Sequence, residues 1–170
     1  MLRLAPQLPL SRRYLAPFLL LLIILAIDQG SKFLARQWVP PSGAGFVEGL
    51  VRLSLVENHG GFLGIAADLP HAFRLFFLIG CVGLLLCACL LVLYRAAEQR
   101  SPYRFPLACI AGGGLSNLLD RLYGDGGVTD FLILGTGMVQ TGIFNLADVF
   151  ILAGSFVLGY RFFRGSKDRW

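Results

Sequence analysis

Four long apolar stretches limit what this chain can fold into. The first runs from about residue 16 to 38, and the others cover about 71–94, 105–123 and 143–163. Each is close to the ~20 residues that an α-helix needs to cross the hydrocarbon core of a bilayer. We therefore expect an all-α membrane protein with four transmembrane helices, built as a single integral membrane domain over residues 1–170.

The composition agrees with a membrane protein. Hydrophobic residues make up 56% of the chain and charged residues only 15%, whereas soluble domains carry about 25% charged residues. The four cysteines lie within apolar stretches and show no C-x-x-C spacing. The composition excludes an ordinary soluble globule. The positions and spacing of the cysteines favour buried thiols over disulfides or a zinc site.

Basic residues predict an orientation in the membrane. They cluster before the first stretch, between the second and third, and after the fourth, at Arg3, Arg12, Arg13, Arg95, Arg100, Arg104, Arg161, Arg164, Lys167 and Arg169. Because cytoplasmic segments of membrane proteins are enriched in Lys and Arg, we expect both termini to be cytoplasmic. The net charge of +5 is then a sign of topology, and no nucleic-acid partner is expected.

The first outer loop, about residues 39–70, is too long for a simple turn. Residues 46–50 and 51–55 have short strand-like patterns, which predict a small extracytoplasmic β-hairpin lying on the membrane. The glycines that follow, Gly60, Gly61 and Gly64, would let the chain approach a ligand closely.

Polar side chains gather at one end of the third and fourth stretches, as Asn117-x-x-Asp120 and Asn145-x-x-Asp148. Residues three apart share a helix face, so each motif presents an amide beside a carboxylate. The two stretches cross in opposite directions, which brings both motifs to the same depth near the outer surface. Asp130, in the loop between them, adds another carboxylate there. A charge within a span costs about 2.5–3.5 kcal/mol on insertion scales, so these groups require partners or a function.

Asp28 and Lys32 in the first stretch are four residues apart and suit an ion pair with a structural role. Ser31 is adjacent to Lys32, so the two side chains point in different directions, and a serine–lysine dyad is disfavoured. His59 and His71 form no His-x-x-x-His pair, which disfavours a zinc hydrolase.

Carboxylates remain the best candidates for chemistry. Two neighbouring carboxyls share a proton, because they cannot both ionise easily. The ionised carboxylate then activates water while the protonated carboxyl polarises a carbonyl. Such a pair hydrolyses an amide with no metal and no cofactor. The alternative is structural, in which these acids pair with Arg121 and with amides to lock the helices together.

The polar motifs together resemble those of the lipoprotein signal peptidase (signal peptidase II) family. The resemblance covers about residues 16–163 and rests on the order Asp28-Gln29-x-Ser31-Lys32, Asn58-x-Gly60, Asn117-x-x-Asp120-Arg121, Val128-x-Asp130-Phe131 and Phe144-Asn145-x-Ala147-Asp148. It implies an aspartic endopeptidase of the bacterial cytoplasmic (inner) membrane that acts near the extracytoplasmic face. The implied substrates are diacylglyceryl-modified prolipoproteins, cut just before the lipidated cysteine.

The resemblance places the catalytic dyad on Asp130 and Asp148, with Asp120 as the rival. Arg121 lies beside Asp120 as a possible counter-charge, which favours Asp130. Asn117 and Asn145 would orient the dyad or bind substrate backbone, Asn58 and Arg121 would contact the peptide, and the loop 60–64 would close over it. The supporting set implied is Asn58, Gly60, Asn117, Asp120, Arg121, Asn145 and Ala147, with Asp28 and Lys32 structural. We expect a monomer surrounded by membrane lipid.

The sequence departs from the family pattern at three places, which bear on substrate preference and loop geometry. The stretch after Asn58 reads His-Gly-Gly-Phe-Leu, and residues 112–117 read Gly-Gly-Gly-Leu-Ser-Asn where the family has Gly-Gly-Ala-x-Gly-Asn. Thr129 stands where the family has the second valine of Val-Val-Asp. A specialised paralogue and a catalytically silent binding protein therefore stay open as alternatives. A proton-coupled carrier is disfavoured, because the acids cluster at one edge and form no ladder across the bilayer.

Overall fold

The computed structural model describes residues 10–46, 49–61 and 69–167, and all structural statements refer to these ranges. Residues 47–48 of the predicted strand at 46–50 lie outside these ranges, as do residues 62–64 of the predicted closing loop. The same holds for Arg3 and Arg169 among the basic residues that predict orientation.

Long helices form at all four predicted apolar stretches. They are α1 (Leu10–Trp38), the continuous segment α2 (His71–Leu75), η2 (Phe76–Cys81) and α3 (Val82–Glu98), then α4 (Arg104–Tyr123) and α5 (Leu146–Lys167). Three of the described helical segments are long and apolar enough to cross a membrane, Arg13–Trp38, His71–Glu98 and Leu146–Arg164. The protein is therefore a multi-pass membrane protein, while a crossing by α4 stays a prediction.

Helix α4 is surrounded by the other long helices, and about half of its residues are buried. It packs against α1, α3 and α5, and its buried residues include Ala108, Ala111 and Asp120. A Cβ atom at Gly113 would lie only 2.5 Å from the carbonyl oxygen of Ala147 in α5. Glycine at this position therefore permits the close contact between α4 and α5.

Several helix boundaries differ from the predictions. Helices α3 and α5 end at Glu98 and Lys167, each four residues past the predicted stretch. Helix α1 starts at Leu10, six residues before the apolar stretch, because a helix continues past the membrane into a polar segment that hydropathy does not detect. Helix α5 starts at Leu146, after the predicted residue 143. Phe144 is instead paired with Leu132, since each backbone amide donates to the other residue's carbonyl oxygen.

The described strands form a four-stranded antiparallel sheet in the order β1-β2-β3-β4. A hairpin is present as β1 (Ala44–Phe46) and β2 (Val51–Asn58), but β1 shares only Phe46 with the strand predicted at 46–50, since Gly49 and Leu50 lie in a turn. The prediction missed β3 (Val128–Thr136) and β4 (Val139–Gln140), which come from the second outer loop. The sheet thus joins both loops, because β2 pairs with β3 from Val51↔Leu134 to Asn58↔Val128.

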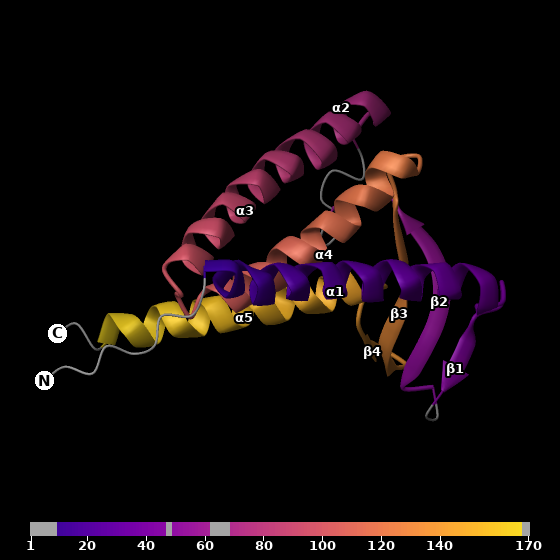
Figure 1. Cartoon of the computed structure of the whole chain (residues 1–170). Helices are drawn as coiled ribbons and strands as arrows, with labels where there is room; N and C mark the ends of the chain where they lie inside the picture. The colour runs from indigo at the N-terminus through magenta and orange to yellow at the C-terminus, as the bar shows by residue number, and fades with distance from the viewer. Residues whose placement is uncertain (1–9, 47–48, 62–68, 168–170) are drawn as a thin grey trace, which may run out of the picture.

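The sheet lies across one end of α1 and α5 (Figure 1). The start of α1, the end of α5 and the connection between α3 and α4 lie at the opposite end of the helices (Figure 1). Arg100 lies in that connection, and Arg95 and Arg104 lie in the ends of α3 and α4 that flank it. The carboxylates at the end of α4, at the start of α5 and in β3 are therefore far from this basic end.

Candidate active site

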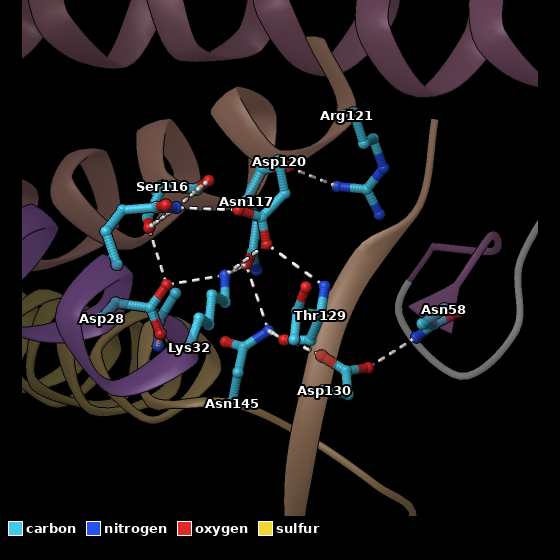
Figure 2. A network of polar contacts seen from close by, with 12 residues as sticks. Asp28, Lys32, Asn58, Ser116, Asn117, Asp120, Arg121, Thr129, Asp130 and Asn145 are labelled. Atoms are coloured by element: carbon cyan, nitrogen blue, oxygen red, sulfur yellow. Dashed lines mark hydrogen bonds and ion pairs between the residues drawn. The ribbon is translucent and has the colours of Figure 1, made fainter. Parts of the chain in front are cut away.

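Lys32 is the central cation of the polar network between α1, α4 and β3 (Figure 2). Its side chain is 0% exposed, and its Nζ lies 2.6 Å from Asp28 Oδ2 and 2.8 Å from Asp120 Oδ2. It also donates to Asn117 Oδ1 at 2.9 Å. These three acceptors match the three donors of an ammonium group. The predicted Asp28–Lys32 ion pair is thus present, with a second carboxylate added.

Asp28 connects three helices. Its Oδ1 accepts a hydrogen bond from the backbone N–H of Ala147 at 2.7 Å, and its Oδ2 accepts one from Ser116 Oγ at 2.6 Å. Asp28 is 0% exposed. A buried carboxylate with this many donors fixes α1 against α4 and the first turn of α5, which agrees with a structural role.

Asp120 is held by a different cation from the one expected. The predicted counter-charge was Arg121, but Arg121 donates to the carbonyl oxygens of Asn117 at 3.2 Å and Gly60 at 2.9 Å. Adjacent residues on a helix face different directions, so proximity in sequence did not give the partner. The ion pair of Asp120 is with Lys32.

The two oxygens of Asp120 are also occupied by neutral donors. Oδ1 accepts from Gln29 Nε2 at 2.8 Å, and Oδ2 accepts from the backbone N–H of Thr129 at 3.2 Å. Both oxygens therefore have partners within the fold. This environment favours a structural Asp120.

Asp130 and Asp148 have amide partners instead. Asp130 Oδ1 accepts from Asn145 Nδ2 at 2.6 Å, and its Oδ2 accepts from Asn58 Nδ2 at 2.9 Å. Asp148 Oδ1 accepts from Asn117 Nδ2 at 2.9 Å, and its Oδ2 accepts from the backbone N–H of Asn145 at 3.1 Å. Asn145 thus contacts both carboxylates, and the structure brings together the residues that the motifs singled out.

The environment of Asp130 changes its proton affinity. Burial raises the pKa of this carboxyl to about 6, although the hydrogen bonds from Asn58 and Asn145 act to lower it. The nearby charge of Asp148 raises the pKa of Asp130 further. A carboxyl that titrates near neutral pH can both hold and release a proton, which is the property that acid–base catalysis requires.

Two asparagines are fixed in orientation by their neighbours. Asn117 accepts from Lys32 at its oxygen, so its NH₂ group is directed at Asp148. Asn145 is 0% exposed, and its Nδ2 also lies 3.2 Å from Asn117 Oδ1 and 3.4 Å from the Thr129 carbonyl oxygen. Their amides are therefore preoriented toward the carboxylates, as expected of supporting residues.

Gly60 lies at the start of the predicted closing loop and is held at both of its backbone polar groups. Its N–H donates to Asn58 Oδ1 at 3.0 Å, and its carbonyl accepts from Arg121 Nη2 at 2.9 Å. Asn58 therefore contacts Asp130 and the loop at once. Contact of Asn58 and Arg121 with a bound peptide stays a prediction.

Sequence reasoning assigned no role to several residues of this network. Gln29 Nε2 lies within hydrogen-bond distance of Ser116 Oγ and Asp120 Oδ1, and Arg36 Nη2 donates to Thr129 Oγ1. The spacing of Ser116 and Asp120, four residues apart on one helix face, could have indicated Ser116. No local signal could have paired Arg36 with Thr129, because the two are 93 residues apart.

Glu57, His59 and Asp125 form a separate group with metal-ligand chemistry, with donor atoms within 4.8 Å of one another. Glu57 and Asp125 are exposed, and the His59 Nδ1 to Asp125 Oδ1 distance is 3.9 Å. Exposed groups of this kind are common without an ion, so we assign no metal to them.

The chain is similar to known proteins over most of its length. The family model described as signal peptidase (SPase) II matches residues 20–164. A protein named lipoprotein signal peptidase from Treponema denticola is 34% identical over 154 residues, which cover 88% of this chain and 89% of that protein. One of the same name from Moorella thermoacetica is 38% identical over 145 residues, with coverage of 84% and 89%.

Two solved structures share the fold, both described as bacterial membrane enzyme structures obtained by the in meso method. One has a TM-score of 0.73 at 17% identity and covers 91% of this chain and 92% of its own. The other has a TM-score of 0.69 at 18% identity, with coverage of 86% and 92%. At these identities the likeness concerns the fold alone. The family model and the relatives above 30% identity show that the chain belongs to the signal peptidase II family.

Proposed function

We propose that this chain is an aspartic endopeptidase that removes signal peptides from diacylglyceryl-modified prolipoproteins, cutting immediately before the lipidated cysteine. Membership of the family supports the substrate class, since the relatives are named lipoprotein signal peptidase. Asp130 and Asp148 form the catalytic dyad. The observation that carries this assignment is their shared partner Asn145, which contacts both carboxylates.

Charge supports the choice of this pair over Asp28 and Asp120. Asp28 and Asp120 each form an ion pair with the Lys32 ammonium group, within 3 Å of its nitrogen. Asp130 and Asp148 are held by neutral amides, which orient a carboxyl group and leave its proton free to transfer. Acid–base chemistry needs the second kind of environment.

The proposed reaction uses one proton shared by the dyad. Asp130, with a pKa of about 6, donates its proton to the oxygen of the scissile carbonyl. Asp148 takes a proton from water as the water oxygen bonds to the carbonyl carbon. Collapse of the tetrahedral intermediate breaks the C–N bond, the leaving amine takes the proton from Asp148, and the carbonyl oxygen returns its proton to Asp130. No step requires a metal or a cofactor.

The orientation follows from the positions of the charges. The basic connection between α3 and α4 lies at the end of the helices remote from the sheet (Figure 1). By the positive-inside rule we propose that this end and both termini are cytoplasmic, in a bacterial inner membrane. The dyad then lies near the extracytoplasmic face, where a lipidated substrate can enter from the outer leaflet.

The test is cleavage of a diacylglyceryl-modified prolipoprotein by purified protein in detergent or lipid. We expect Asp130→Asn and Asp148→Asn to lose about 10²–10⁴-fold in kcat, the usual contribution of acid–base groups. Each change is nearly isosteric and removes only the titrating oxygen. Asp125→Asn is the matched control, because it alters an exposed aspartate five residues before Asp130 and should cleave like the wild type.

Asp120→Asn separates a catalytic from a structural Asp120. It should unfold more easily and keep most of its activity per folded molecule, so folding is measured for every variant. Inactive folded Asp120→Asn together with active Asp130→Asn would overturn the dyad assignment. A folded wild type that binds the lipidated precursor and cleaves nothing would instead support a silent binding protein.

A further inference from the structure

Helix α1 contacts the site through residues on successive turns of one face. Asp28, Lys32 and Arg36 are spaced by four residues, so their side chains follow one another along the helix. Asp28 contacts α5 through the N–H of Ala147, and Lys32 contacts α4 through Asp120. Arg36, one turn further, donates to Thr129 Oγ1 in β3. Asp28 and Lys32 thus join α1 to the neighbouring helices, and Arg36 joins it to the sheet.

We propose that Arg36 is a positioning residue for the peptidase reaction, acting through Thr129 to hold β3 so that Asp130 faces Asn145. The inference rests on the proposed function, because it assumes that Asp130 is catalytic. Thr129 is joined to Asp130 by a single peptide unit, so a shift of Thr129 displaces the backbone from which the Asp130 carboxyl extends.

Thr129 is held at each of its polar groups. Its backbone N–H donates to Asp120 Oδ2 at 3.2 Å, and its carbonyl oxygen lies 3.4 Å from Asn145 Nδ2. Its Oγ1 accepts from Arg36. The first two contacts use backbone atoms and are open to any residue with an N–H, but the third needs a side-chain acceptor. Arg36 therefore adds a constraint that depends on threonine being at this position.

This constraint belongs to the present sequence. The resemblance places a valine where Thr129 stands, and valine has the shape of threonine without the hydroxyl. The exchange leaves β propensity and volume nearly unchanged. Side-chain shape alone therefore does not explain a threonine at residue 129. Its hydroxyl is explained by the hydrogen bond that it accepts from Arg36.

Arg36 also lies in the last turn of α1, where a positive charge favours the helix C-terminus. A change at Arg36 alone would mix this effect with the contact to β3. The test therefore combines Arg36→Met, which keeps the apolar stem and removes the donor, with Thr129→Val, which removes only the acceptor. Thr129→Ser keeps a hydroxyl and serves as the conservative rescue.

Steady-state kinetics distinguish a residue that positions Asp130 from one that only stabilises the fold. We expect Thr129→Val and Arg36→Met to lower kcat about three- to tenfold with KM nearly unchanged, as for loss of one hydrogen bond to a charged group near the surface. The double variant should be no worse than the worse single variant. The pH at which kcat is half-maximal should also move, because Asn145 would no longer be aligned with Asp130.

Two further variants serve as controls for the kinetic measurements. Thr129→Ser should recover most of the wild-type kcat. Arg52→Met removes another arginine contact of the same sheet, with Gln140, and should leave kcat unchanged. An unchanged kcat and pH profile in Thr129→Val, in a preparation whose wild type cleaves, would overturn the inference while leaving the proposed function intact. Additive losses in the double variant would overturn it as well.

Amide hydrogen exchange tests the same contact without activity. Residues 129–132 should exchange faster in Thr129→Val and Arg36→Met than in the wild type, and no faster still in the double variant. Residues 155–163 of α5, remote from the contact, should be unaffected. Equal exchange over β3 in all four proteins would overturn the inference even if the wild type cleaved nothing.

Discussion

Replacement of Lys32 by methionine should be among the most destabilising single changes in this chain. The ammonium group is fully buried and lies 2.6 Å and 2.8 Å from two carboxylates, Asp28 and Asp120. Removing one partner of a buried pair costs about 3–5 kcal/mol, because an uncompensated charge is left behind. Here two carboxylates lose their cation together, so we expect the upper end of this range. Native domains have only about 5–15 kcal/mol of stability, and Lys32→Met should thus approach loss of folding.

The same reasoning predicts rescue by removing the stranded charges. In the triple variant Lys32→Met, Asp28→Asn, Asp120→Asn, every ionised group of the cluster becomes neutral at almost constant volume. Buried ion clusters replaced as a whole are often close to neutral for stability. The triple variant should therefore recover most of the free energy of unfolding lost in Lys32→Met. Each new asparagine keeps one carbonyl oxygen for two former donors, which are Ser116 and Ala147 at residue 28 and Gln29 and Thr129 at residue 120, so part of the loss should remain.

The measurement is reversible unfolding in mixed detergent micelles at neutral pH, followed by circular dichroism. Arg52→Met is the control, since it removes a basic side chain outside the cluster. A loss below about 1 kcal/mol in Lys32→Met would contradict mutual compensation of the three charges, as exposed ion pairs contribute no more than this. A triple variant less stable than Lys32→Met would contradict it too.

Two further predictions concern Asp130 and the contact between α4 and α5. Because the folded pKa of Asp130 is raised to about 6, its protonation stabilises the fold at acidic pH. That contribution is lost as pH rises through about 6, so the wild type should lose stability relative to Asp130→Asn between pH 4 and 7. A difference that is flat with pH would contradict the raised pKa. Gly113→Ala should cost about 1–3 kcal/mol, because its Cβ would meet the Ala147 carbonyl 2.5 Å away. Gly159→Ala, with no atom within 4 Å of its Cβ, is the control and should gain up to about 1 kcal/mol from helix propensity; equal effects at both sites would refute the packing argument.

The helices were predictable because transfer into a bilayer imposes a length and a composition that a sequence shows directly. The residues at which the helices begin and end were harder to predict. Helix α5 begins after Phe144 because that residue pairs with Leu132 of β3, an interaction decided by tertiary structure. Strand β3 itself was missed, since its pairing partner β2 lies some 70 residues earlier and no turn connects them. Local patterns located β2, whereas β1 shares only Phe46 with the strand predicted at 46–50, and local patterns cannot identify long-range strand pairs.

In the site, too, local spacing predicted some contacts, and contacts between distant segments could not be predicted. Helical spacing correctly placed Asn117 and Asp120 on one side of α4, and the Asp28–Lys32 pair followed from a four-residue interval. Spacing could not tell that Lys32 would also neutralise Asp120, nor that Arg121 would turn to Gly60. These partners come from different elements. Assigning a counter-charge from a sequence neighbour failed because neighbours on a helix point apart.

The arrangement of charges explains how one buried cation can serve both the fold and the proposed chemistry. Lys32 touches the two structural carboxylates directly, but it reaches Asp148 only through the amide of Asn117, whose oxygen faces Lys32 and whose nitrogen faces the acid. A direct contact would stabilise the ionised carboxylate strongly and oppose proton transfer. An interposed amide passes on orientation and only a weakened part of the charge. The four acids of the site therefore divide by their nearest donor: Asp28 and Asp120 pair directly with the Lys32 ammonium group, while amides hold Asp130 and Asp148 in position for the proposed proton transfers.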